Sequence, residues 1–155
     1  MFPFFFHRLR FALLTPATLV IFNFFATVSN AQSQLYKPIP LPPSNEITDN
    51  LTEKDIPTGQ GGFARDYSVF LQAGDQVAID LISDNFDTIV TLLAVDGSTV
   101  GENDDGPDGS TNSLLFARIS KSGVYTVRVR SFSETGIGKF TLKVSRLRAI
   151  PPGSR

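Results

Sequence analysis

Apolar and polar residues alternate with a period of two in four segments of the chain. An alternation of this kind predicts β-strands, each with one face in a dry core. Two other segments, 88–95 and 113–119, are more continuously apolar, which predicts central strands covered on both faces. The apolar positions of the four alternating segments are Tyr67, Val69 and Leu71; Val77, Ile79 and Leu81; Tyr125, Val127 and Val129; and Phe140, Leu142 and Val144.

Short glycine-containing turns separate these segments, at 73–75, 95–98, 121–123 and 134–138. No window has a sustained helical period, and one or two weaker strands are expected near 46–56. Strands of this length and number predict an all-β fold, an antiparallel and jelly-roll-like β-sandwich of about seven to nine strands.

The N-terminus has the pattern of a secretory signal peptide. Arg8 and Arg10 precede an uncharged stretch at 11–28, and Ala31 ends a run of small residues. We expect residues 1–31 to be removed by cleavage after Ala31, which predicts a secreted or periplasmic protein. The alternative is an uncleaved membrane anchor, because the uncharged stretch reaches the lower limit for spanning a bilayer. The sequence has no cysteine, so no disulfide framework is expected.

The composition divides the remaining chain into three parts. Residues 32–45 hold four prolines in six positions, which predicts an extended linker without a core of its own. Residues 46–148 contain all the predicted strands and form the expected β-sandwich domain. Residues 149–155 are a short C-terminal tail. The prolines of the linker are Pro38, Pro40, Pro42 and Pro43.

Charge is unevenly distributed along the chain. Nine acids and no Lys or Arg lie from Asp75 to Asp108, whereas nine bases and one acid lie from Arg118 to Arg155. Either the two halves pair their charges across neighbouring strands, or the acids form a surface that gathers cations. Without the signal, twelve bases and fifteen acids remain, a net charge of −3. Because the basic residues also lack interleaved aromatics, nucleic acid is not an expected partner.

The order of short motifs resembles the bacterial pre-peptidase C-terminal domain over residues 46–146. The motifs lie in "DYSVFLQAGDQVAIDL", "FDTIVTLLAVDGSTVGENDDG", "SLLFARISKSGVYTVRVRS" and "GIGKFTLKV". The resemblance implies a secreted β-sandwich accessory domain, usually appended to peptidases and similar to the collagen-binding modules of bacterial collagenases. No peptidase precedes the domain here, which makes a structural companion or targeting subunit of a separately encoded peptidase an alternative.

Catalysis is not expected of the exported chain. Its only histidine, His7, leaves with the signal, which excludes Ser-His-Asp and Cys-His chemistry and ordinary zinc sites. A carboxylate-dependent hydrolase stays open as an alternative, but no apolar pocket that would raise the pKa of one carboxyl is evident beside the acids of 102–108.

The acidic segment 100–112 is a candidate calcium site, because calcium prefers carboxylate, amide and carbonyl oxygens. The EF-hand spacing fails from Asp104, since Gly106 occupies the third position and Leu115 the twelfth. A site would therefore be assembled in space. The alternative is that the Asn and Asp residues of the segment make only side-chain-to-backbone turns. The candidate ligands are Asp87, Asn103, Asp104, Asp105 and Asp108.

The family resemblance implies a second set of calcium ligands. In the related collagen-binding modules, acids before the first core strands bind calcium, and the matching positions here are Glu46, Asp49 and Asp66. The segment lacks the closely repeated glutamates of those modules.

A carbohydrate-binding platform is not favoured, because the chain has no tryptophan and two of its three tyrosines fall on predicted dry faces. Phe132, at a strand end, is expected to be exposed and suits a protein contact. The sequence thus predicts a secreted, monomeric, non-catalytic accessory or interaction module. It would bind a protein or an extracellular polymer, with calcium as a candidate stabilising ion and without a membrane contact after cleavage.

Overall fold

The computed structural model describes residues 36–59, 61–107 and 109–147, so the expected signal peptide and C-terminal tail lie outside the described residues. The described residues form strands, turns and loops, and no helix among them is long and apolar enough to span a membrane. The strands are β1 (Ile39–Pro40), β2 (Glu46–Leu51), β3 (Ile56–Pro57), β4 (Phe63–Leu71), β5 (Gln76–Ile82), β6 (Thr88–Leu93), β7 (Thr99–Asn103), β8 (Ser113–Arg118), β9 (Gly123–Ser131) and β10 (Gly138–Leu147).

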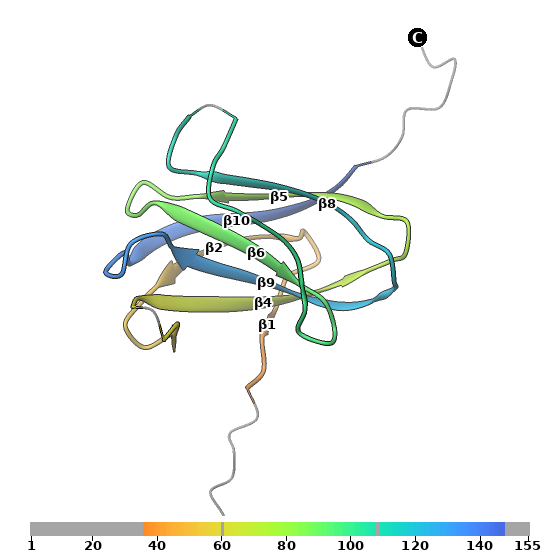
Figure 1. The fold of residues 1–155 in the computed structure, drawn as a ribbon, viewed down its shortest axis with the longest axis horizontal. Coiled ribbons are helices and arrows are strands. Elements are labelled where there is room, and N and C mark those ends of the chain that lie inside the picture. Colours follow the sequence, from red (N-terminus) through yellow and green to blue (C-terminus); the bar gives the residue numbers. More distant parts are fainter. Residues whose placement is uncertain (1–35, 60, 108, 148–155) are drawn as a thin grey trace, which may run out of the picture. The chain divides into compact units, whose positions relative to one another are not determined.

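Two sheets pack face to face, as Figure 1 shows. The six-stranded sheet has the order β1-β4-β9-β6-β7, with β3 also paired to β4, and the four-stranded sheet has the order β2-β10-β5-β8. Every strand pair is antiparallel except β1 with β4. The expected all-β sandwich is confirmed.

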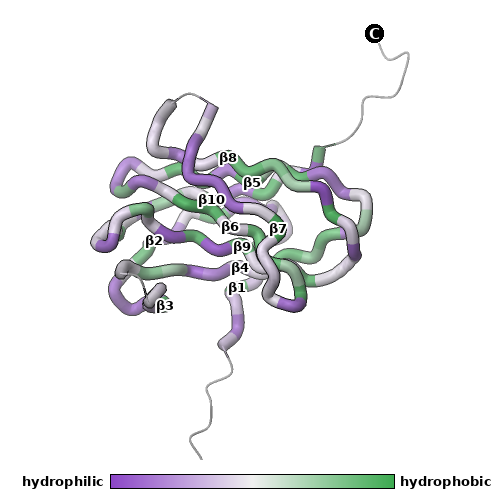
Figure 2. Tube along the Cα trace, in the orientation of Figure 1, coloured by the Kyte–Doolittle hydropathy of each residue, from purple (hydrophilic) through white to green (hydrophobic). Residues whose placement is uncertain are grey.

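The core follows the period of two in the sequence. All twelve apolar residues of the four alternating segments are buried, because each of their strands turns one face to the opposite sheet. Figure 2 shows the same alternation of hydrophobic and hydrophilic residues along the strands. Two edge-to-face contacts join Phe140 to Tyr67 and to Phe86, with ring centroids 6.2 and 6.3 Å apart. Such pairs favour a specific packing as well as burial.

The two continuously apolar segments differ in position. β6 lies between β9 and β7 and is buried over nearly its whole length, as expected. The expectation of a central strand at 113–119 is wrong, because β8 is the last strand of the four-stranded sheet. Nothing described covers the outer face of β8, and Phe116 there is 63% exposed.

The proline-rich linker also needs a correction. Ile39 and Pro40 form a short parallel strand beside Tyr67 and Ser68 of β4, and Leu41 packs partly against the core. The Leu41 N–H donates to the Ser68 carbonyl over 3.0 Å. The segment is extended, as proline requires, but its second half belongs to the domain.

The predicted turns bring the acidic and basic halves of the chain together. Asp75, in the turn after β4, forms a 3.2 Å ion pair with Arg146 of β10. Glu102 of β7 pairs with Arg130 of β9 at 3.1 Å. At these two places the charges pair between strands, which agrees with the first of the two interpretations of the charge distribution.

Candidate functional site

The acidic loop begins at Asn103, whose side chain holds the loop against β8. The Asn103 Nδ2 donates to the carbonyls of Asp105 and Leu114, at 2.7 and 2.9 Å. The Leu114 N–H in turn donates to the Asp105 carbonyl at 3.1 Å. The connection projects beyond the two sheets at the top of Figure 1. This amide therefore acts on the backbone, as in the turn alternative, and keeps its Oδ1 for other partners.

The other candidate calcium ligands are placed as follows. The Asp87 carbonyl accepts a hydrogen bond from the Phe132 N–H, and the next residue, Thr88, donates its N–H to Thr111 at the far end of the acidic loop. Asp108 lies outside the described residues. Among the described residues, no three His, Cys, Asp or Glu side chains are grouped so as to hold a metal ion. Calcium binding stays a prediction.

The three acids implied by the family resemblance each face a basic side chain of the protein. Glu46 pairs with Lys143 at 3.4 Å, and Asp49 pairs with Arg65 at 3.0 Å. Asp66 is bound by Arg128. A cation at any of these carboxylates would have to compete with an ion pair already formed.

A row of charged and hydroxyl side chains crosses the outer face of the six-stranded sheet. The row starts at Asp66, which lies directly opposite Arg128 in the β4–β9 register. The Nε and Nη2 of Arg128 donate to the two oxygens of Asp66, each at 2.8 Å. The hydrogen bonds that Arg128 donates to Asp66 raise the pKa of Arg128 further above its usual range. Although Asp66 is on the outer face, only 3% of it is exposed.

The row continues across β6 and β7. The Thr91 hydroxyl donates to Glu102 Oε2 at 2.6 Å, and Arg130 Nη2 lies 3.1 Å from Glu102 Oε1. The Thr91 hydrogen bond, together with Arg130, outweighs desolvation and lowers the pKa of Glu102. Glu102 is therefore an acceptor at neutral pH and ties the edge strand β7 to the face.

A groove of about 310 Å³ runs between this row and the short strand β3. Its lining combines apolar, hydroxyl and charged groups. A guanidinium carries five N–H donors, and the two hydrogen bonds from Arg128 to Asp66 use only two of them. The groove can therefore bind a polar group while the hydrogen bonds between Arg128 and Asp66 stay in place. Its lining residues are Ile56, Pro57, Thr58, Ala64, Thr91, Leu93, Thr99, Glu102, Arg128 and Arg130.

The same face carries an apolar row nearer the β4–β5 turn. Phe70 and Val124 lie opposite each other on β4 and β9 and are 53% and 55% exposed. Ser68 and Thr126 separate the two rows. The outer face thus offers apolar and charged contacts side by side.

A second polar cluster closes the open side of the sandwich between β2 and β4. The Tyr67 hydroxyl donates to Asp49 Oδ2 at 2.8 Å, and Arg65 donates to the same oxygen at 3.0 Å and to Asp55 at 2.6 Å. Burial, followed by the hydrogen bond to Asp49, raises the pKa of Tyr67 well above its usual value. These bonds hold the β2–β3 connection on the core, and their role is structural.

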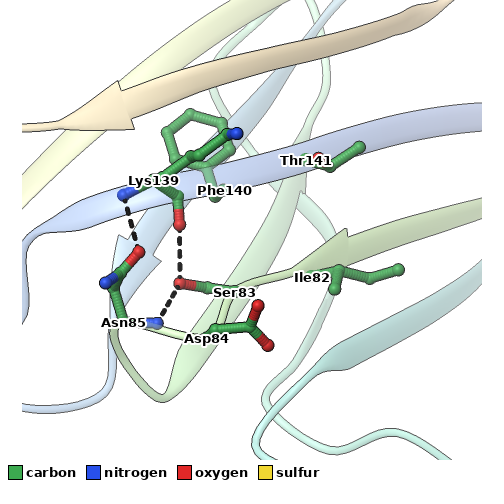
Figure 3. Close-up of a pocket in the computed structure, with 7 residues that line it drawn as sticks. All are labelled: Ile82, Ser83, Asp84, Asn85, Lys139, Phe140 and Thr141. Atoms are coloured by element: carbon green, nitrogen blue, oxygen red, sulfur yellow. Dashed lines mark hydrogen bonds between the residues drawn. The ribbon is translucent and has the colours of Figure 1, made fainter.

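Figure 3 shows a smaller pocket, of about 200 Å³, where the β5–β6 connection meets β10. The buried Ser83 hydroxyl donates to the Lys139 carbonyl at 2.8 Å and accepts from the Asn85 N–H at 3.1 Å. Asn85 Oδ1 accepts from the Lys139 N–H at 3.1 Å. The Ser83 hydroxyl is bound to backbone groups, so we regard Ser83 as a residue that joins the β5–β6 connection to β10 and not as a nucleophile.

The family comparison agrees with this geometry. Residues 64–131, from β4 to the end of β9, match the model of the bacterial pre-peptidase C-terminal domain. Over this segment the chain resembles a bacterial pre-peptidase C-terminal (PPC) domain. The matched segment contains the whole charged row: Asp66, Thr91, Glu102, Arg128 and Arg130.

The solved structures with a similar fold include a collagenase domain and a lysozyme inhibitor. One is the pre-peptidase C-terminal domain of Bacillus anthracis collagenase, with a TM-score of 0.53, 12% identity, and coverage of 70% of this chain and 95% of that chain. The other is Aeromonas hydrophila PliG, a periplasmic inhibitor of g-type lysozyme, with a TM-score of 0.52, 14% identity, and coverage of 72% and 96%. Comparison with curated proteins gives no match to the sequence.

Sequence reasoning did not find the charged row. Arg128 and Arg130 are visible as polar positions of an alternating strand, but Thr91 lies in a continuously apolar segment and gives no signal of its own. Their partners come from β4 and β7, so only the strand order assembles the row. Arg128 is therefore more than an isolated surface charge, because its partner Asp66 is buried.

Proposed function

We propose that this PPC-like domain is a non-catalytic module that acts in the periplasm or outside the cell and binds another protein through the outer face of its six-stranded sheet. The observation that carries the proposal is the groove between β3 and the charged row. It combines guanidinium donors, a carboxylate acceptor and apolar walls on one open surface. Protein–protein interfaces commonly combine charged and apolar groups in this way, with arginine and apolar side chains at the centre of the interface.

The electrostatics support binding in preference to acid–base catalysis. A general acid or base works best with a pKa near the working pH. The pKa values of Asp49 and Glu102 are instead shifted downward, away from that range. Asp66 is bound at both oxygens by Arg128, and the Ser83 hydroxyl is bound to the backbone. These groups are arranged to hold the fold and to present fixed charges.

The comparisons support a protein as the partner. One structural neighbour is a domain of a collagenase, and the other is an inhibitor of a lysozyme and is periplasmic. Each of these proteins works on or beside a second macromolecule. The signal-like residues 1–31 support export, and a separately encoded secreted peptidase is one partner that the proposal allows.

The test is capture with a groove variant and a matched control. Residues 32–155 are immobilised and exposed to the exported proteins of the host, with wild type, Arg130→Ala and Lys143→Ala compared side by side. Arg130 lines the groove, whereas Lys143 forms its ion pair on the other sheet. We expect a protein retained by wild type and Lys143→Ala but lost with Arg130→Ala.

Retention of the same protein by all three domains would contradict the groove as the binding site. A domain that retains no exported protein would contradict the proposed function itself. Thermal melting of the three domains checks that Arg130→Ala is folded.

A further inference from the structure

The last strand of the four-stranded sheet, β8, presents unpaired backbone groups. In the β5–β8 ladder, Leu115 lies opposite Ile79 and Phe116 lies opposite Ala78. In an antiparallel ladder, alternate residues direct both N–H and C=O to the neighbour, and those between them direct both groups away. The direction at any one position therefore determines it along the whole strand.

Two observations determine the direction for β8. The N–H and C=O of Leu114 are bound by Asp105 and by the Asn103 side chain, on the side away from β5. At the other end, the Ile119 N–H donates to the Asp75 carbonyl at 2.8 Å, toward the β5 side. The residues in phase with Leu114 are Phe116 and Arg118. Their N–H and C=O groups consequently point away from the sheet, and no described residue binds them.

The opposite edge of the same sheet is capped at two positions, Glu46 and Asn50. On β2, the Ser44 hydroxyl donates to the Glu46 carbonyl and accepts from the Glu46 N–H. The Asn50 N–H is bound by Asp49 Oδ1 at 2.8 Å. Such caps keep an edge from pairing with another chain. Phe116 and Arg118 have no cap of this kind in the described part of the chain.

The side chains beside this free edge suit a ligand with both apolar and acidic character. Phe116 is 63% exposed, and Leu147 of β10 is 45% exposed. Arg118 lies on the same face, with no carboxylate of the described residues within ion-pair distance. A shallow depression of about 380 Å³ adjoins them, lined by Gln76, Val77, Phe116, Ala117, Arg118 and Leu147.

We propose that β8 is a strand-addition site, at which an extended segment of another protein pairs with the backbone of Phe116 and Arg118. The incoming strand carries an apolar residue opposite Phe116 and an acidic residue opposite Arg118. These two residues are two positions apart in the partner, because side chains on one face of a strand recur with a period of two. The segment thus has the form apolar-x-acidic in one chain direction or the other.

A second copy of this chain is not the occupant that the charges favour. Strand β8, Ser113–Arg118, contains no acidic residue, so a copy pairing through the same strand offers no carboxylate to Arg118. The proposal rests on the proposed function in so far as the domain binds proteins, but its site lies on the other sheet from the groove.

Parallel selections from a displayed library of random dodecapeptides test the chemistry. The baits are residues 32–155 as wild type and as Arg118→Glu. We expect wild type to enrich apolar-x-acidic segments and Arg118→Glu to enrich segments with lysine or arginine at the acidic position. A synthetic peptide from the first selection should bind Arg118→Glu about tenfold more weakly than wild type, because attraction becomes repulsion.

Two proline variants test the backbone pairing. Arg118→Pro removes an outward N–H without removing a bond to β5, as proline does at an edge position. Thr48→Pro is the matched control, since the 2.8 Å bond from the Val144 N–H to the Asn45 carbonyl places the Thr48 N–H on the outward side of β2. We expect the selected peptide to bind Thr48→Pro as it binds wild type and to bind Arg118→Pro more weakly than Arg118→Ala, which lacks the same guanidinium but keeps the N–H. Hydrogen exchange at the Phe116 and Arg118 amides should slow when the peptide is bound.

Three results would overturn the inference: no enriched motif, the same motif from both baits, or equal binding to Arg118→Pro and Arg118→Ala with unchanged exchange at the two amides. None of these results bears on the groove, because the capture experiment with Arg130→Ala tests that face separately. Circular dichroism and melting show whether each proline variant is folded. If Arg118→Pro is unfolded, the charge-swap selection and the exchange of wild type with peptide decide.

Discussion

Asp66 and Arg128 form a pair of hydrogen bonds between β4 and β9, each with a donor–acceptor distance of 2.8 Å, although the two residues are 62 positions apart in the chain. The Asp66 side chain is 1% exposed and that of Arg128 is 35% exposed. Removing one partner of such a pair leaves a buried charge without compensation, which costs more than the pair itself contributes.

Arg128→Asp should therefore destabilise the domain by about 2 to 3 kcal/mol, below the range for fully buried pairs because Arg128 is partly solvated. Arg118→Asp makes the same chemical change at an exposed position without an ion pair among the described residues, and should cost within about 0.5 kcal/mol. Urea unfolding measures both. Equal losses would mean that the Asp66–Arg128 pair contributes nothing.

The core register is tested in β9 with one buried and one exposed valine. Val127 is fully buried and Val124 is 55% exposed. Val127→Asp should unfold the domain or cost several kcal/mol, about 3 or more, because an unpaired carboxylate would enter the apolar layer. Val124→Asp should leave the melting temperature within a few degrees of wild type. Similar melting curves for the two variants would refute the assigned faces.

Asp49 should contribute a pH-dependent part of the stability. Desolvation works against its charge, but hydrogen bonds from the Asn50 N–H, Tyr67 and Arg65 outweigh it and lower the pKa below 3.8. A depressed carboxyl pKa stabilises the fold above the unfolded pKa, and the contribution is lost as the pH falls through the folded pKa. We expect this loss below about pH 4, and a flatter stability curve there for Asp49→Asn. Urea midpoints at several pH values measure it, with the exposed Glu53→Gln as control.

Calcium binding by the acidic loop remains to be tested by melting. If Asp104 and Asp105 bind calcium with Kd of about 0.1 to 1 mM, a few millimolar calcium adds roughly 1 to 2 kcal/mol and raises Tm by several degrees. Asp104→Asn with Asp105→Asn should remove this increment, while magnesium should give less of it in wild type. If the wild-type Tm is the same in calcium and in chelator, the calcium hypothesis is wrong and the acidic residues only form a turn.

If the signal-like segment is cleaved during export, the mature protein has a defined N-terminus. Expression of the full chain in a secreting host should release a protein that starts at Gln32, since Ala31 ends the signal-like segment. Intact mass of the exported protein measures the cleavage position. A membrane-bound species that retains residues 1–31 would indicate an anchor.

The sequence by itself determined the fold class and the two faces of each regular strand. An alternation of apolar and polar residues shows which side chains of a strand face the core, whichever strands lie beside it. The burial of Tyr67, Val127 and Leu142 could therefore be predicted. The family motifs could be recognised for the same local reason, because each motif lies within one strand and its adjoining turn.

Only the tertiary structure decided which strands lie side by side, and every functional proposal depends on that. Arg128 occupies a polar position of its alternating strand, yet its ion-pair partner comes from β4, 62 positions earlier in the chain. The segment 113–119 was predicted as central because continuous apolarity cannot distinguish a covered strand from an edge strand with an exposed phenylalanine. Asn103 is a candidate ligand from the sequence, but only the fold brings its amide Nδ2 to the Leu114 carbonyl. Periodicity reports one strand's environment, whereas ion pairs, edges and grooves are properties of pairs of strands.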